Sequence, residues 1–238
     1  MDRTRWIIFG VLVVAVFGVL IFNNRDSSVD VDKMDPQKVV TSTKKEEVIP
    51  DHLFGSESKK VVLFEYGDYQ CPGCGAAHPK LKAITEHYKE QLTFIFRNFP
   101  LTTIHPNALA AATAAEAAAM QNKFWQYHDK LYESQDDWST ADTDKRGAIF
   151  KKYAKELGLN EKQFEKDLAN NAIARKIDTD QALGKKAGAQ ATPTLILAGK
   201  TLKTEQFNTQ KDLEDTVREA IKASGQALPE PIPNNLSN

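Results

Sequence analysis

The sequence predicts an α/β fold that is interrupted by a block of helices and preceded by one transmembrane helix. Short apolar runs bounded by turn residues are typical of buried strands, and they flank a long central stretch with helical spacing and no strand pattern. A separate apolar run occupies residues 6–22. The expected order is strand, helix, strand, several helices, strands and helix, which indicates a mixed core with a helical insertion.

The N-terminal segment has the pattern of a membrane anchor. Arg3 and Arg5 precede Trp6 to Phe22, and such a helix would span roughly 25 Å of a hydrocarbon core of about 30 Å. A cleaved secretory signal is the alternative, but residues 19–22 offer no small side chains for a cleavage site. The arginines predict a cytoplasmic N-terminus, so we expect a single-pass protein of the cell membrane with its remaining chain outside the cytoplasm.

Composition divides the rest of the chain. Its 238 residues are 41% hydrophobic and 26% charged, which suits one globular domain. After the anchor (residues 1–23), polar residues 24–52 are expected to form a flexible tether and residues 53–226 the folded domain. Residues 227–238 are rich in proline and are expected to be an unstructured tail. A net charge of −1 makes a nucleic-acid partner unexpected.

Each element of the folded domain has a local sequence pattern. Val61 to Phe64 form a continuous apolar run that indicates a strand buried on both faces, and "LTFIFRNFP" indicates a second strand. A helix is expected to begin at Pro72, and Thr209 to Ala223 form the final amphipathic helix. Further helices are expected in residues 107–120, 123–135, 142–158, 160–170 and 171–187, followed by a strand at 195–197 and a hairpin turn at 198–200.

The two cysteines of the chain, Cys71 and Cys74, are placed asymmetrically on the first of these helices. Cys71 takes the N-cap position before Pro72, so its sulfur would face free backbone amides and the positive end of the helix dipole, both of which lower a thiol pKa. Cys74 begins the buried stripe of the helix and should keep a higher pKa. One open and one shielded sulfur are what thiol-disulfide exchange requires.

Two other roles for the cysteine pair have less support from the sequence. A structural disulfide that closes only four residues would constrain the unfolded chain little. A zinc site would need two more ligands from the five histidines, which lack the paired spacing of a zinc finger. We therefore predict no metal site and no cofactor.

Two further positions leave alternatives open. Glu65 lies in an apolar strand, where a buried carboxyl group needs a partner or a task, although a side chain turned to solvent at the strand end is equally compatible. Thr192 precedes Pro193 just before a strand, and an X-Pro bond is cis only about 5% of the time, so the sequence by itself predicts trans.

Three segments, in the same order, resemble the DsbA-like thiol:disulfide oxidoreductases of the thioredoxin superfamily, including their membrane-anchored bacterial members. The segments are "FEYGDYQCPGC", "FRNFPLTTIHPNALAAATAAEAAAMQNKFWQYHDKLYESQDDW" and "GAQATPTLILAGK". The resemblance covers about residues 52–223. It implies a thioredoxin fold with an α-helical domain inserted at about residues 105–171.

The resemblance also assigns roles to single residues. Cys71 would be the nucleophile that meets substrate, and Cys74 its resolving partner. Thr192 and Pro193 match the cis-proline loop of the family, which offers its backbone to an extended substrate chain. Glu65 matches the buried acid that serves many relatives as a proton relay.

Three other positions in the matching segments either have no family role or depart from the family pattern. His105 and His128 lie in matching segments without a family role, and they are expected to be surface or capping residues. Gly73 stands where the best-known oxidases of the family have a histidine that stabilises the thiolate. Without it the pair should be less oxidising, between DsbA at about −120 mV and thioredoxin at about −270 mV.

The sequence therefore predicts an extracytoplasmic, monomeric oxidase of exported proteins with free thiols. A DsbB-like or VKOR-like membrane reoxidase linked to quinones would regenerate its disulfide. A reductase or isomerase with the same pair is an alternative, although isomerases usually dimerise and no dimerisation domain is evident between tether and core. A non-catalytic, membrane-tethered peptide-binding module is the alternative from another class.

Overall fold

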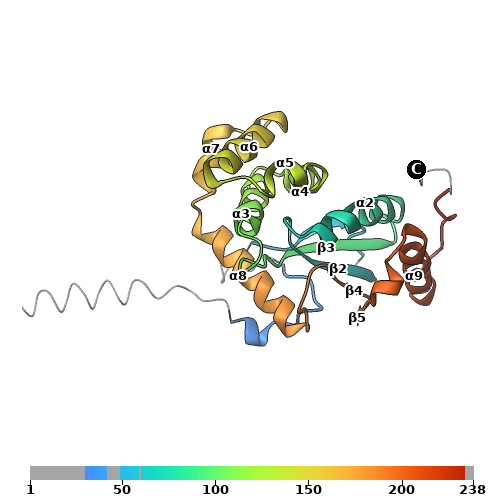
Figure 1. Ribbon diagram of the computed structural model, residues 1–238. Helices are drawn as coiled ribbons and strands as arrows, with labels where there is room; N and C mark the ends of the chain where they lie inside the picture. Colours follow the sequence, from blue (N-terminus) through green and yellow to red (C-terminus); the bar gives the residue numbers. More distant parts are fainter. Residues whose placement is uncertain (1–29, 42–48, 59, 234–238) are drawn as a thin grey trace, which may run out of the picture. The chain divides into compact units, whose positions relative to one another are not determined.

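A five-stranded mixed sheet forms the centre of the computed structural model, which describes residues 30–41, 49–58 and 60–233 (Figure 1). The strands are β1 (His52–Gly55), β2 (Val61–Gly67), β3 (Leu92–Asn98), β4 (Thr194–Leu197) and β5 (Lys200–Thr201), in the order β1-β3-β2-β4-β5. Only β2 and β3 are parallel, and the helix between them supplies the crossover that parallel neighbours need.

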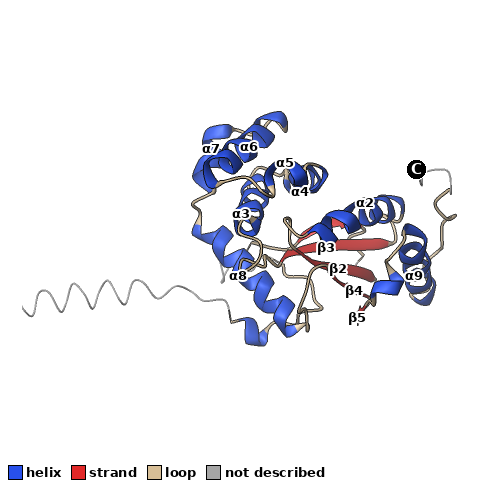
Figure 2. Cartoon of the chain, viewed as in Figure 1, coloured by secondary structure: helices blue, strands red, loops and turns tan. Residues whose placement is uncertain are grey.

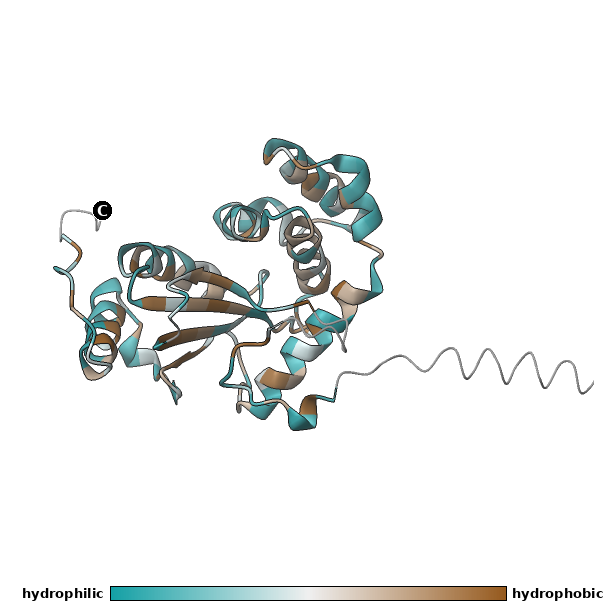
Figure 3. Ribbon diagram, turned by 180° about the vertical axis from the view of Figure 1, so that it is seen from behind, coloured by the Kyte–Doolittle hydropathy of each residue, from teal (hydrophilic) through white to brown (hydrophobic). Residues whose placement is uncertain are grey.

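Helices cover both faces of the sheet (Figures 1 and 2). On one face α2 (Pro72–His87) packs beside α9 (Gln210–Ala223), and on the other α8 (Asn171–Lys186) lies against β3 and β2. Because both faces are covered, the central strands are buried almost throughout, and Figure 3 shows them as hydrophobic ribbons among mostly polar helices. The predicted α/β core is confirmed.

The predicted helical insertion separates β3 from α8. It consists of α3 (Ala108–Ala119), α4 (Phe124–Glu133), α5 (Gln135–Trp138), α6 (Thr143–Glu156) and α7 (Glu161–Asp167). The alanine-rich α3 is buried along most of its surface and contacts α4, α6, α7 and α8, because small side chains let neighbouring helices approach closely. The insertion contacts the sheet domain through α4, which packs against α2, and through α3, which packs against α8.

The predicted flexible tether over residues 24–52 is wrong where the structure describes it. Residues 31–41, which we call the N-terminal arm, begin with η1 (Val31–Lys33) and lie against the sheet domain. Arg97 of β3 donates to the carbonyl oxygens of Pro36 at 2.6 Å and Lys38 at 2.7 Å. The arm is held because its backbone oxygens satisfy a buried guanidinium, a partnership without any local sequence pattern.

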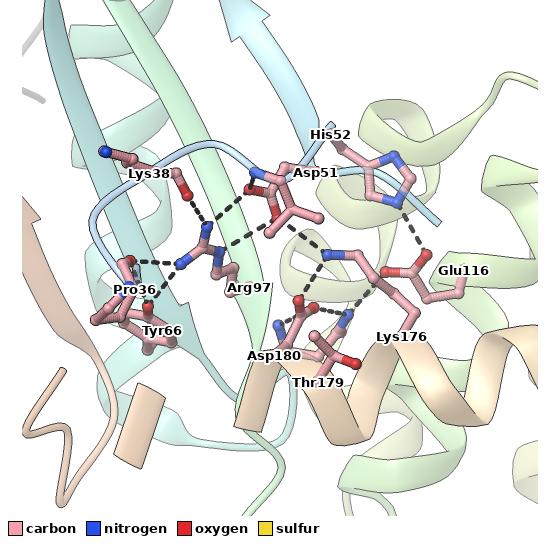
Figure 4. Close-up of polar contacts among 12 residues, drawn as sticks. Pro36, Lys38, Asp51, His52, Tyr66, Arg97, Glu116, Lys176, Thr179 and Asp180 are labelled. Atoms are coloured by element: carbon pink, nitrogen blue, oxygen red, sulfur yellow. Dashed lines mark hydrogen bonds and ion pairs between the residues drawn. The ribbon is translucent and has the colours of Figure 1, made fainter. Parts of the chain in front are cut away.

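A buried charge network fixes the arm to the sheet and to α8 (Figure 4). Arg97 Nη2 lies 2.8 Å from Asp51 Oδ2, and Lys176 Nζ lies 3.1 Å from Asp51 Oδ1 and 2.6 Å from Asp180 Oδ1. His52 pairs with Glu116 at 2.8 Å. Each charged group of this network therefore has a partner at hydrogen-bond distance, as buried charges require.

The predicted unstructured tail over residues 227–238 is also wrong for its described part, residues 227–233. The backbone nitrogen of Ile232 donates to Glu214 at 2.7 Å, and Arg218 of α9 donates to the carbonyl oxygen of Pro229 at 2.7 Å. Ile232 itself is buried. Proline prevents regular structure here, but side chains of α9 satisfy the extended backbone.

The predicted membrane anchor, residues 1–23, lies outside the described residues. Within the described part of the chain, none of the helices has both the length and the apolar character needed to cross a bilayer.

Candidate active site

The two cysteines lie at the N-terminus of α2. Cys71 is the N-cap residue with extended backbone angles (φ −69°, ψ 122°), and Pro72 occupies the first helical turn. Both thiols are free. Cys74 is fully buried, which confirms that it is shielded, but Cys71 is only 9% exposed and is less open than predicted. The cis-proline loop covers part of its sulfur, which lies 3.4 Å from the carbonyl oxygen of Thr192.

The surroundings of Cys71 favour its thiolate. A hydrogen bond from the Cys74 thiol lowers the pKa of Cys71 most, partial burial opposes this, and bonds from Thr192 and the amides of Gly73 and Cys74 bring the pKa to about 5. The Thr192 hydroxyl is buried and has no other partner among the described residues. It is therefore free to donate to the ionised sulfur.

Cys74 has the opposite environment. Burial raises the pKa of Cys74 well above its usual value, and the nearby Cys71 sulfur and the Glu65 carboxylate raise it further. One cysteine is thus ionised at neutral pH while its neighbour on the next turn is protonated. This confirms the pKa asymmetry that the N-cap argument predicted.

Glu65 is buried in β2, with 2% of its surface exposed, so the open question of its burial is decided. Its Oε1 has no hydrogen-bond partner among the described residues. Burial raises the pKa of Glu65 to about 8, and the charge of Cys71 contributes in the same direction. The carboxyl group therefore carries a proton at pH 7 and faces the region of the two sulfurs.

The Thr192-Pro193 peptide bond is cis, as the family resemblance implied and as X-Pro statistics by themselves did not. The loop lies beside the start of α2. A Cβ added at Gly73 would lie 3.5 Å from Pro193 Cδ and 3.6 Å from Cys71 Sγ, which are ordinary contact distances. The predicted site residues thus converge, and the space at Gly73 accepts a side chain.

The helical insertion supplies an active-site residue that the sequence did not indicate. Gln135 of α5 donates from Nε2 to the carbonyl oxygens of Tyr69 at 2.7 Å and Cys71 at 3.0 Å. A Cβ on Gly75 would lie only 2.6 Å from Gln135 Oε1, so this glycine makes room for the contact. Gln135 therefore positions the loop that carries Cys71.

The two histidines expected at the surface have different positions. His105 is partly exposed and its Nδ1 lies 2.7 Å from Asp68 Oδ2 in the loop after β2. The prediction is wrong for His128, which is 2% exposed and bonds through Nδ1 to the Tyr69 hydroxyl at 3.0 Å. Its aromatic neighbours on α4 and β3 bury it, because the ring packs as a flat apolar surface.

A thioredoxin fold with two cysteines at a helix N-terminus and a cis-proline loop beside them defines a class of thiol-bearing α/β proteins. A family model described as Thioredoxin matches residues 47–222, and the chain belongs to this family. Within the family its fold is the DsbA-like form, in which a helical domain is inserted.

Solved structures with this fold include three bacterial proteins. BdbD from Bacillus subtilis superposes with a TM-score of 0.61 at 24% identity, over 72% of this chain and 93% of BdbD. Alpha-DsbA1 from Wolbachia pipientis gives 0.62 at 19% identity, over 80% and 98%. A thioredoxin-like oxidoreductase from Silicibacter pomeroyi gives 0.59 at 24% identity, over 72% and 92%.

Curated relatives match by sequence over a smaller part of their length. The Na(+)/H(+) antiporter NhaA 1 of Mycolicibacterium vanbaalenii is 34% identical over 151 residues, which are 63% of this chain and 23% of that protein. NhaA 3 of Salinispora tropica is 35% identical over 150 residues, 63% of this chain and 22% of that protein. The chain thus spans less than a quarter of the length of these relatives.

Proposed function

We propose that this protein is a thiol:disulfide oxidoreductase that oxidises thiols of exported proteins through Cys71 and Cys74. The observation that carries the proposal is the asymmetry of the pair. The pKa of Cys71 is lowered to about 5, while burial holds the pKa of Cys74 well above its usual value. Neither a structural disulfide nor a peptide-binding module requires its two cysteines to differ in pKa.

The oxidised pair accepts two electrons in two exchange steps. A substrate thiolate attacks Cys71 Sγ, the bond to Cys74 breaks, and Cys74 leaves with the electron pair. Glu65, protonated at neutral pH because its pKa is about 8, supplies the proton that Cys74 takes up. A second substrate thiolate then attacks the substrate sulfur of the mixed disulfide and expels Cys71 as a stable thiolate.

The cis-proline loop gives substrate a place to bind during these steps. Thr192 and Pro193 are half-buried beside Cys71, while Pro72 and Gly73, which follow Cys71, are exposed. An extended peptide that pairs with the backbone of the loop would bring its cysteine to the open side of Cys71.

The reduced pair must return its electrons to an oxidant. A quinone-linked membrane reoxidase of the DsbB-like or VKOR-like kind would fit this step. Arg3, Arg5 and the apolar residues 6–22 support an anchored protein whose site lies outside the cytoplasm, next to such a partner.

The oxidising direction rests on the stability of the Cys71 thiolate. Its pKa of about 5 lies between values of about 3.5 for DsbA and about 7 for thioredoxin, so an intermediate potential is expected. Net reduction by the same pair would require a potential near that of thioredoxin.

The decisive experiment equilibrates the full-length protein with glutathione and measures the fraction of oxidised Cys71–Cys74. In parallel, Cys74→Ala should accumulate mixed disulfides with exported proteins, because the resolving thiol is absent. Cys71→Ala is the matched control, since its remaining thiol is fully buried and should trap nothing.

Absence of exchange with glutathione together with an empty Cys74→Ala trap would exclude catalysis and favour the binding module. Exchange at a potential near about −270 mV would retain the catalytic class and contradict the oxidising direction.

A further inference from the structure

A group of side chains that could bind a metal ion lies between α2 and α4, apart from the two thiols. His78 of α2 and His128 and Asp129 of α4 each offer one potential ligand atom, and the three atoms lie within 4.8 Å of one another. They line a small cavity of about 30 Å³ whose wall includes Trp125. A cavity of this volume can hold a single small ion or a water molecule.

The buried ring of His78 has an unpaired nitrogen, which supports a ligand at this position. Its side chain is 93% buried, yet its Nε2 has no hydrogen-bond partner among the described residues. Asp129 Oδ1 is 3.7 Å from this nitrogen, which is too far for a hydrogen bond. A buried ring nitrogen without a partner destabilises the folded state, so an occupant that binds it would remove this penalty.

One ring nitrogen of His128 already has a partner. Its Nδ1 lies 3.0 Å from the Tyr69 hydroxyl, which leaves Nε2 as the nitrogen available to a ligand. Metal-bound imidazoles commonly donate their second N–H to such an outer partner, which fixes both tautomer and ring plane.

Asp129 is held by a neighbouring cation. Lys82 Nζ lies 2.6 Å from Asp129 Oδ2 and 3.0 Å from Glu133 Oε1, so its charge is shared between two carboxylates. The other oxygen, Asp129 Oδ1, faces His78. The local charge of these three groups is −1, which still favours a cation.

We propose that His78, His128 and Asp129 form a binding site for a divalent transition-metal ion, with Zn²⁺ as the best match. Two imidazoles and one carboxylate with an open fourth position form a ligand set that zinc accepts. Zinc–ligand bonds of about 2.1 Å place tetrahedral ligands about 3.4 Å apart, close to the 3.7 Å between His78 and Asp129. A pair at the upper limit of 4.8 Å must approach by about 1.4 Å.

The site does not depend on the redox function. His78 lies one helical turn after Cys74 on the same face of α2, so a bound ion would link this helix to α4 of the insertion. Metal binding should therefore stabilise the contact between the two parts of the fold whether or not the thiols are active.

The test uses the full-length protein in its oxidised form, because a disulfide cannot compete for zinc as a thiolate would. After chelation and removal of bound metal, calorimetric titration with Zn²⁺ is expected to show one equivalent bound and a rise in Tm. His78→Phe keeps the ring that stacks on Tyr132, and Asp129→Asn keeps the side-chain shape, so both remove a ligand with little change in packing.

Each of these variants should bind zinc at least about 100-fold more weakly, since even outer partners of metal ligands contribute about 10- to 100-fold. His87→Gln is the matched control, because His87 is exposed near the end of the same helix and should leave zinc affinity unchanged. Absence of saturable binding by the wild-type protein would overturn the proposal. Equal affinity in wild type and Asp129→Asn, or equal loss in His87→Gln, would also overturn it.

Discussion

Buried titratable groups on the two faces of the β2–β3 pair differ in whether they have hydrogen-bond partners. Glu65 and Tyr66 are neighbours on β2, so their side chains point to opposite faces of the sheet. On the α2 face, Glu65 Oε1 lacks a hydrogen-bond partner among the described residues. On the α8 face, the Tyr66 hydroxyl bonds to Arg97, which belongs to the charge network of Figure 4.

The difference separates groups that hold the fold from groups that exchange protons. In the network, burial would raise the pKa of Asp51, but the charges of Lys176 and Arg97 outweigh it and lower the pKa to about 2. Burial by itself would lower the pKa of Lys176, but the carboxylates of Asp180 and Asp51 raise it. Asp51 and Lys176 therefore stay charged at all physiological pH values, although burial raises the pKa of Asp180 in the same network to about 6. Glu65, with a pKa of about 8, can release a proton near neutrality.

The largest effect is expected when the network loses its central cation. Lys176→Met would leave Asp51 and Asp180 without the ammonium group that pairs with both. Removing one partner of a buried ion pair costs about 3–5 kcal/mol, so the free energy of unfolding should fall by that amount in urea denaturation.

Lys151→Met is the matched control for this prediction. Lys151 pairs with Glu165 at 2.8 Å on the surface, where an ion pair contributes less than about 1 kcal/mol. If Lys176→Met costs no more than this control, the network does not stabilise the fold as its geometry indicates.

On the α2 face, a substitution should increase the free energy of unfolding. Glu65→Gln removes a carboxyl group whose pKa is raised from 4.5 to about 8, so it should increase the free energy of unfolding by about 2–3 kcal/mol at pH 7. The sign follows from linkage: the folded state of the wild type keeps its proton while the unfolded chain loses it above pH 4.5. Wild-type stability therefore falls as pH rises from 4.5 to about 8.

Denaturation curves at several pH values check this prediction. The two proteins should have nearly equal stability at pH 4, where both states of the wild type are protonated, and the gain should stop growing above about pH 8. A gain that is the same at every pH would show that packing, and not ionisation, is responsible. Reduction of the disulfide should also slow in Glu65→Gln, because Cys74 loses its proton donor.

A smaller effect is expected from Gly73→His, which places a hydrogen-bond donor beside the Cys71 thiolate. The position tolerates a side chain, because an added Cβ makes only ordinary contacts with Pro193 and Cys71. A lowering of the Cys71 pKa by one unit corresponds to about 1.4 kcal/mol, or about 30 mV toward a more oxidising pair.

Equilibrium with glutathione measures this change, and Gly73→Ala controls for the loss of glycine. If Gly73→His and Gly73→Ala shift the potential equally, the imidazole does not act on the thiolate, and the glycine does not account for an intermediate potential.

Sequence reasoning succeeded where a property depends on residues close together in the chain. The N-cap position of Cys71, the first-turn proline and the burial of Cys74 all lie within four residues, and helix geometry relates them directly. The strands β2, β3 and β4 and the longer helices were predictable for the same reason, since apolar periodicity reflects which face of an element is covered. The strand β1 (His52–Gly55) was not predicted. The buried Glu65 could be suspected from its apolar strand, but its lack of a partner could not.

The failures all involve segments brought together from far apart. The N-terminal arm and the C-terminal residues 227–233 are polar or proline-rich, so their composition predicted disorder. They are ordered because Arg97 and Arg218 donate to their backbone oxygens. Gln135 reaches the Cys71 carbonyl across 64 positions of the chain, and no local pattern relates the two residues.

The sequence by itself determined the class of fold, the positions of the two thiols and the difference in their acidity, because these depend on short-range backbone geometry. Tertiary structure alone decided how far Cys71 is covered and which buried charges have partners. It also brought His78 together with His128 and Asp129, which are about 50 residues away. The physical reason is that burial and charge pairing depend on which distant surfaces meet when the chain packs, and this is specified by the whole fold and not by any one segment.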